Sequence, residues 1–191
     1  LNFLKNKDLF LKILLSSIPV MLVGFILVQF DLINHLRNIK IIAWTTIIFG
    51  ILLFISDKFA VQKKMSKNFN YKSAIFIGTL QILSLIPGVS RSGITISAAR
   101  MLKFNRYDSA KISFLISIPT LAAVSLFGLK NLIINDDVDF SFLNLISIFF
   151  SFVFSFLTIK FFLKYIKNFS LNIFVIYRII LGIILLIFSG L

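Results

Sequence analysis

The sequence predicts an all-α, polytopic membrane protein with about five spanning helices and one re-entrant helical hairpin. Hydrophobic residues make up 59% of its 191 residues, more than the roughly half that soluble domains contain. They gather in segments long enough, or nearly so, to cross a hydrocarbon core of roughly 30 Å. The net charge of +13 lies mainly in the short connections, as in the cytoplasmic loops of membrane proteins. This placement argues against a nucleic-acid-binding face.

The spanning helices and their direction follow from hydropathy and loop charge. The predicted spans are Leu9–Phe30, Ile41–Ile55, Ile112–Leu129, Phe142–Leu163 and Leu171–Phe188. Lysines before the first span place its start in the cytoplasm, because basic loops are retained there. The basic stretches 56–72 and 164–168 are then inside, and the acidic loop of Asp136, Asp137 and Asp139 is outside.

The segment Ser73–Leu102 decides the architecture. It lies between the basic stretches 56–72 and 103–111, which both belong in the cytoplasm. Only residues 94–102 separate its polar motif from the second stretch, too few to span a bilayer. A re-entrant hairpin with its tip at Pro87–Gly93 meets both constraints. The alternative, one kinked spanning helix, would reverse every later loop and place the acidic loop inside.

The tip has the composition of an anion site. Pro87 ends the incoming helix, Gly88 and Gly93 permit close backbone approach, and a helix is expected to resume after Gly93. A helix N-terminus beside an arginine is typical of phosphate binding, so Arg91 is the candidate ligand. Non-helical backbone at membrane depth is tolerated only when it is buried in protein or lines a cavity.

The neighbouring polar residues each have a structural alternative. Ser90, Ser92 and Thr95 either bind the anion or cap and back-bond the helix. Gln81 either faces the pocket or makes an interhelical hydrogen bond. Arg178 is expected to snorkel or to pair with a loop group.

The stretch "LSLIPGVSRSGITISAARMLKFNRYDSAKISFLISIPTL" resembles the second signature region of the bacterial undecaprenyl-diphosphatases, the bacitracin-resistance membrane phosphatases. That family shows a Pro-Gly-x-Ser-Arg-Ser-Gly stretch followed by a "FSFLL-x-x-P"-like span. Here these appear as Pro87–Gly93 and "ISFLISIP", Ile112–Pro119. Gln81 and the closing "VIYRIILG", Val175–Gly182, are similar as well. The resemblance covers the whole chain in layout and is sharpest over Gly78–Thr120.

The resemblance implies hydrolysis of undecaprenyl diphosphate, which recycles the lipid carrier for cell-wall synthesis and gives bacitracin resistance. It also implies inverted repeats, each with a re-entrant hairpin, and this hairpin matches the second repeat. Carried over, Ser90 and Arg91 fall on catalytic positions, with Ser92, Gly93 and Thr95 binding the substrate phosphate. The implied partners are a polyprenyl diphosphate and the bilayer of the bacterial cytoplasmic membrane. A homodimer is a further expectation.

The chain departs from the family at the first signature, which carries a Glu-x-x-x-Glu pattern and a Pro-Val-Ser-Ser-Thr-Gly-His stretch. It has no glutamate, and its only histidine, His35, lies in no such sequence. We therefore expect the first hairpin and one span to be missing at the N-terminus, and residues 1–191 alone to be inactive. With no cysteine and no glutamate, ligands for a divalent cation, Mg²⁺ or Ca²⁺, are expected in the missing part.

Three alternatives to this enzyme are considered. A polyprenyl-phosphate transporter or flippase also uses inverted repeats with broken helices. A degenerate, inactive homologue would share the layout without the chemistry. A lipid phosphatase of the acid-phosphatase type needs catalytic histidines, and the single His35 argues against it.

Overall fold

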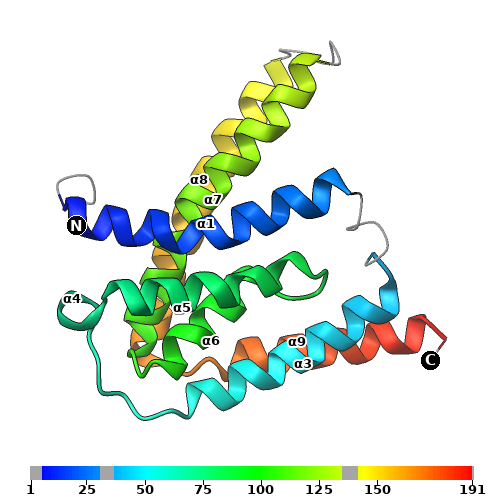
Figure 1. Cartoon of the computed structure of the whole chain (residues 1–191). Helices are drawn as coiled ribbons and strands as arrows, with labels where there is room; N and C mark the ends of the chain where they lie inside the picture. Colours follow the sequence, from blue (N-terminus) through cyan, green and yellow to red (C-terminus); the bar gives the residue numbers. More distant parts are fainter. Residues whose placement is uncertain (1–5, 31–36, 135–141, 191) are drawn as a thin grey trace.

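The computed structural model describes residues 6–30, 37–134 and 142–190, and these residues form helices joined by short connections (Figure 1). The elements are α1 (Lys7–Gln29), α3 (Ile39–Asp57), α4 (Met65–Asn68), α5 (Tyr71–Gln81), the 3-10 helix η2 (Ile82–Leu85), α6 (Arg91–Met101), α7 (Arg106–Ile134), α8 (Phe142–Asn168) and α9 (Asn172–Phe188). The prediction of an all-α fold is confirmed. His35 and the loop of Asp136, Asp137 and Asp139 lie outside the described residues.

Within the described ranges, four helices are long and apolar enough to cross a membrane. These are α1, α3, α7 and α8, and each contains or overlaps a predicted span. The last predicted span is present as α9, which is shorter at 17 residues. The chain is therefore a polytopic membrane protein.

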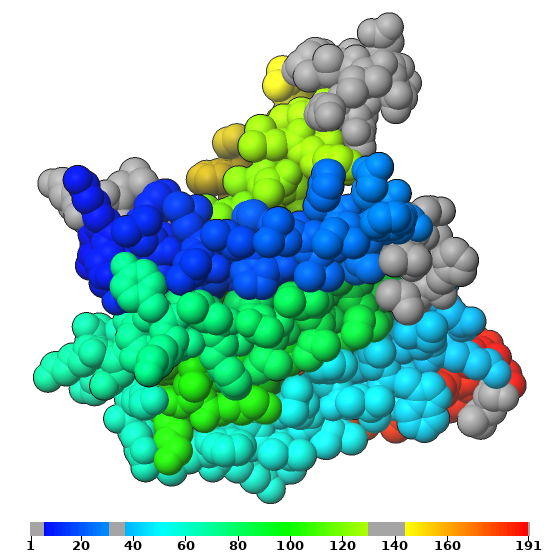
Figure 2. All heavy atoms as spheres, viewed as in Figure 1, coloured from blue at the N-terminus to red at the C-terminus, as the bar shows by residue number. Residues whose placement is uncertain are grey.

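The helices stack so that the hairpin lies between other elements. Helix α5 packs on α1, α6 packs on α3, and α3 packs on α9. Figure 2 shows this order on one face, where α1, the hairpin and α3 form successive bands. Helix α7 contacts α1 and α6, and with α8 it projects steeply from the stack (Figure 1). The hairpin is thus enclosed on two sides by spanning helices.

Close backbone contact fixes α5 on α1. A Cβ added at Gly78 would lie 2.2 Å from the backbone oxygen of Ser16. Helices in membranes associate through small residues of this kind, because little hydrophobic force acts between them. The contact therefore sets the position of the whole incoming arm of the hairpin.

An ionic cluster holds the base of the hairpin. Arg100 is 2% exposed, and its guanidinium donates to the carbonyl oxygens of Phe104 and Asp57, each at 2.6 Å. Arg106 at the start of α7 donates two hydrogen bonds, of 2.8 and 2.9 Å, to the Asp57 carboxylate. Bidentate pairs of this kind add geometric specificity. The cluster joins the end of α3 to the end of α6 and the start of α7.

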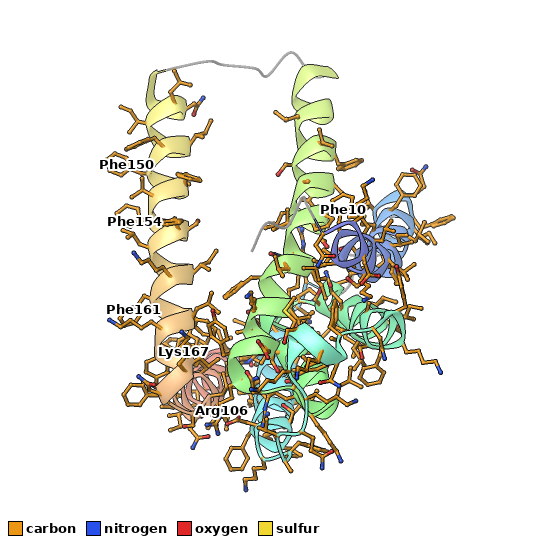
Figure 3. The ribbon with its side chains drawn as sticks, turned by 90° about the vertical axis from the view of Figure 1, so that its left-hand side faces the viewer. Phe10, Arg106, Phe150, Phe154, Phe161 and Lys167 are labelled. Carbon is orange, nitrogen blue, oxygen red and sulfur yellow. The ribbon has the colours of Figure 1, made fainter. Side chains whose placement is uncertain are left out.

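Phenylalanine covers much of the projecting helix α8. Phe150, Phe154 and Phe161 point away from the rest of the chain (Figure 3) and are 51%, 63% and 72% exposed. In a bilayer such side chains meet lipid tails, which are as apolar as they are. The prediction that the phenylalanines are lipid-facing or packing residues agrees with this arrangement.

Candidate functional site

The chain reverses direction at the polar motif. Helix α5 ends at Gln81 and continues into η2, which ends at Leu85; residues 86–90 are not helical, and α6 returns against α5 (Figure 1). Gly88 turns the chain with a φ of 88°, and a Cβ there would lie 2.1 Å from the Thr45 hydroxyl oxygen. Glycine is required here, since both the dihedral angle and the space exclude a side chain. The segment forms a hairpin of short helices, and its re-entrant placement in a membrane stays a prediction.

The outgoing helix begins earlier than the sequence indicated. We expected it to resume after Gly93, and that expectation is wrong: α6 begins at Arg91. Ser90 is the N-cap, with extended backbone angles, and its Oγ accepts a 3.1 Å hydrogen bond from the Gly93 N–H. A glycine is tolerated in a first turn whose free N–H is satisfied by a cap. Ser92 and Gly93 are therefore the second and third residues of α6.

Two side chains of the spanning helix α3 hold the tip. The hydroxyl of Thr45 donates to the Pro87 carbonyl oxygen at 2.7 Å, and that of Thr46 donates to the Gly88 carbonyl oxygen at 3.3 Å. Thr45 lies six residues into α3, about 9 Å along its axis. The tip is therefore fixed inside the stack of helices rather than at its edge.

Arg178 on α9 completes these contacts. Its Nη2 donates to the Gly88 carbonyl oxygen at 2.9 Å, and its Nε donates to the Thr46 carbonyl oxygen at 3.4 Å. The residue is 7% exposed, so it does not snorkel to the interface. Sequence reasoning missed Thr45 and Thr46 altogether, because a hydroxyl within an apolar span carries no distinguishing pattern.

The predicted site residues divide between two faces of α6. Ser90, Ser92 and Gly93 line a cavity toward α9. Thr95 is buried against α7, where its hydroxyl oxygen lies 2.6 Å from that of Ser113. Gln81 also faces α7, donating a 3.2 Å hydrogen bond to Thr120. The structure therefore gives Gln81 the interhelical hydrogen bond and sets Thr95 apart from the cavity.

Arg91 occupies the first turn of α6 and is half-buried. Its side chain has no hydrogen-bond or ion-pair partner within the described ranges. Thr95, one turn later, donates a 2.9 Å hydrogen bond to the Arg91 backbone oxygen. A half-buried guanidinium without a partner among the described residues is available to bind an anion.

The cavity beside Ser90 and Ser92 has a volume of about 440 Å³. Its polar end is formed by Thr46, Ser90, Ser92, Gly93 and Arg178. Most of its wall is apolar and comes from α3, α6, α8 and α9, including Leu53, Ile96, Phe162, Phe174 and Leu181. A cavity with one polar, cationic end and a long apolar wall suits an amphiphile with an anionic head.

Among the described residues, no three histidine, cysteine, aspartate or glutamate side chains gather where a metal ion could be held. The cavity lining has no carboxylate. These residues do not fit the divalent cation that the resemblance implies.

Comparison with known proteins places this arrangement in a family. The family pattern described as "Bacitracin resistance protein BacA" matches residues 3–184. The chain belongs to the BacA family. Membership agrees with the hairpin motif, since Pro87–Gly93 lies within the matched range.

Several relatives of the BacA family carry an enzyme name. The chain is 53% identical, over 98% of its length, to the undecaprenyl-diphosphatase of Pelagibacter ubique (strain HTCC1062), of which it covers 73%. It is 41% identical over 95% of its length to that of Alcanivorax borkumensis, covering 69%. It is 40% identical over 92% to undecaprenyl-diphosphatase 1 of Pseudoalteromonas translucida, covering 66%. The chain thus spans about two thirds to three quarters of these relatives.

Proposed function

We propose that the whole protein hydrolyses undecaprenyl diphosphate to undecaprenyl phosphate and phosphate, and so recycles the lipid carrier for cell-wall synthesis. The observation that carries this is BacA family membership over nearly the whole chain, with relatives named undecaprenyl-diphosphatase. The half-buried Arg91, whose side chain has no hydrogen-bond or ion-pair partner among the described residues, supports it, because a phosphate would supply the missing negative charge.

In the proposed reaction an oxygen nucleophile attacks the terminal phosphorus. The bond to the bridging oxygen breaks, and undecaprenyl phosphate leaves with the electron pair. Where the nucleophile is a serine hydroxyl, water then attacks the phosphoserine, which releases phosphate and restores the hydroxyl. Arg91 would neutralise the negative charge that grows on the phosphoryl oxygens. Electrostatic stabilisation of that charge in the transition state is the main source of rate enhancement in phosphoryl transfer. Ser90 and Ser92 would bind phosphate oxygens from the cavity side of α6. The cavity lining offers no base for Ser90, and the nucleophile would be the hydroxyl of Ser90 or of a serine in another part of the whole protein.

Several partners belong to the same proposal. The membrane would be the bacterial cytoplasmic membrane, and the product phosphate would be released at its outer face. A divalent cation, Mg²⁺ or Ca²⁺, would be held by groups outside the described residues. Hydrolysis of the lipid diphosphate would give bacitracin resistance. We also propose that the protein forms a homodimer.

The test is phosphate release by the whole protein in liposomes that contain undecaprenyl diphosphate. Arg91→Ala should lower kcat by about 10²–10³-fold, the usual cost of removing one charge-stabilising donor. Arg37→Ala, an exposed arginine in a connection, is the matched control and should not change kcat. Full activity of Arg91→Ala would remove Arg91 from the mechanism, and absence of turnover by the native protein would refute the proposed function.

The transporter alternative predicts a different accessibility. The chain has no cysteine, so Ser92→Cys introduces a single thiol at the cavity. A flippase would expose that thiol to membrane-impermeant reagents from each side in turn. A phosphatase with a fixed site would be labelled from one side only.

A further inference from the structure

A separate cavity, the basal cavity, opens where α3 and α8 end and α7 begins. It has a volume of about 610 Å³ and is lined from α3, α6, α7, α8 and the connections beside them. Asp57 in its wall follows Thr45 by twelve residues of α3, which is about 18 Å along the helix axis. The basal cavity shares no lining residue with the cavity at the hairpin tip. It is therefore a different place in the fold.

The sequence positions of its lining residues indicate its depth in a membrane. Every lining residue except Arg100 belongs to one of the basic stretches 56–72, 103–111 and 164–168. Loop charge predicts that all three stretches are cytoplasmic. Because they directly adjoin the ends of spanning helices, the basal cavity would lie at the level of the lipid head groups of the cytoplasmic leaflet.

The lining has more positive than negative charge. Three of its side chains are cationic, Arg100, Arg106 and Lys167, and Asp57 is its only carboxylate. That carboxylate accepts two hydrogen bonds from Arg106 and lies 3.4 Å from Arg100 Nε. Lys167 has no ion-pair partner in the described ranges. Its Nζ lies 4.8 Å from the centre of the Tyr107 ring, which holds the ammonium group without neutralising it.

Two of these cations can reach an anion in the basal cavity. Arg106 uses Nε and Nη2 on Asp57, and its side chain is still 38% exposed. Lys167 comes from the neighbouring helix α8, and Figure 3 shows both residues at the same end of the molecule. Ile166 beside it is the only buried residue among the described residues of α8. An anion bound to both cations would thus join α8 to α7 where α8 meets the rest of the chain.

The apolar part of the lining favours a lipid over a free anion. Phe59 and Val61, in the connection after α3, line the basal cavity and are 41% and 56% exposed. Free phosphate would gain nothing from such side chains, whereas the acyl chains of a phospholipid would cover them. Basic pockets between membrane helices on the cytoplasmic side are known to bind anionic head groups.

We propose that the basal cavity binds an anionic phospholipid of the cytoplasmic leaflet, with Arg106 and Lys167 on its head-group phosphate and its acyl chains against Phe59 and Val61. The excess positive charge selects against a zwitterionic lipid, which carries a cation of its own. Bound lipid stabilises the folded protein, because it binds only when α3, α7 and α8 are assembled. The inference does not depend on the proposed hydrolysis.

Lipid binding to the whole protein in detergent tests this by native mass spectrometry. The protein is titrated with phosphatidylglycerol and, in parallel, with phosphatidylcholine of the same acyl chains, and inorganic phosphate is added as a competitor. The Kd should be at least tenfold lower for phosphatidylglycerol, and millimolar phosphate should not displace it. Lys167→Gln should raise that Kd about fivefold, the usual contribution of one lysine near an anionic lipid surface.

Lys164→Gln is the matched control. Lys164 is also exposed and on α8, and its loss changes the net charge equally, but it lies outside the basal cavity lining. Its Kd for phosphatidylglycerol should change less than twofold. Equal effects of the two variants would show a general attraction to a basic face and overturn the site.

The other arms separate the lipid from its alternatives. Equal Kd values for the two lipids would show that the basal cavity does not select charge, and displacement by inorganic phosphate would make it a free-anion site; either result overturns the proposal. Lys167→Gln should keep the native Tm without lipid and gain less Tm when phosphatidylglycerol is added. A lower Tm without lipid, together with an unchanged Kd, would assign Lys167 a structural role only.

Discussion

Arg178 and Gly88, ninety residues apart in the chain, are joined by a 2.9 Å hydrogen bond from the Arg178 guanidinium to the Gly88 carbonyl oxygen. With the threonines of α3, this bond fixes a non-helical turn between spanning helices. Backbone groups of such a turn must be satisfied by protein when water is scarce. The Pro87–Gly93 motif is therefore positioned by helices that carry no part of it.

Gly88→Ala is expected to distort the tip and to abolish activity of the whole protein. Its φ of 88° disfavours a side chain, and its Cβ would lie 2.5 Å from the Ile42 carbonyl oxygen in addition to the Thr45 contact. Gly190→Ala is the control, because Gly190 has a φ of 68° but nothing lies within 4 Å of its Cβ. It should cost only the left-handed strain, roughly 1–2 kcal/mol. Equal loss of Tm and activity in both variants would show that the dihedral angle, not the clash, matters.

Asp57→Asn should destabilise the base of the hairpin. The Asp57 side chain is 4% exposed and pairs with Arg100 and Arg106, so the change leaves Arg100 buried without its counter-charge. Breaking a buried pair in this way costs about 3–5 kcal/mol, measured as a lower Tm in detergent. Asp8→Asn is the control. It removes the ion pair between Asp8 and Lys12, and because the Asp8 carboxylate is largely exposed, the Tm should change little. A Tm for Asp57→Asn like that of the Asp8 control would contradict the structural role.

Gly78→Ala should loosen the contact between α1 and α5. The added methyl group meets the backbone of Ser16 rather than a flexible side chain, so one of the helices must move. Overpacking of this kind costs about 1–3 kcal/mol. Gly128→Ala is the matched control, because no atom lies within 4 Å of its Cβ, and alanine should stabilise that helix by roughly 0.5–1 kcal/mol. Opposite shifts of Tm are the expected result, and destabilisation by Gly128→Ala alone would contradict it.

Residues 1–191 expressed alone should insert into membranes but release no phosphate from undecaprenyl diphosphate. The reason is chemical: the chain has no glutamate, and no metal-binding group of side chains occurs in the ranges that the structure describes. Far-UV circular dichroism in detergent would verify the helices, and a phosphate-release assay would test the activity. The Arg91→Ala variant of the same chain is the background control. Release above that background would show that residues 1–191 carry a complete site.

Hydropathy predicted the long helices well, because each of α1, α3, α7 and α8 is apolar along its own length. The basic stretches on both sides of Ser73–Leu102 predicted a hairpin, and Pro87 and Gly88 predicted its turn, which the structure places at residues 86–90. The start of α6 was misplaced by three residues: glycine was taken as the breaker, whereas Ser90 caps a helix that contains Gly93. Local composition cannot reveal which side chain will accept a hydrogen bond from a particular backbone N–H.

The sequence by itself determined that this is a helical membrane protein with a polar, glycine-containing motif at a turn, because apolar length and residue type act locally. Only the tertiary structure decided which residues meet at that turn. It separated Ser90 and Ser92 from Thr95 across α6, and it brought Arg178 to the tip. Those relations depend on how α3, α6, α7 and α9 pack. Packing in a membrane is set by small residues and interhelical hydrogen bonds, whose partners lie 42 to 132 positions apart at this site.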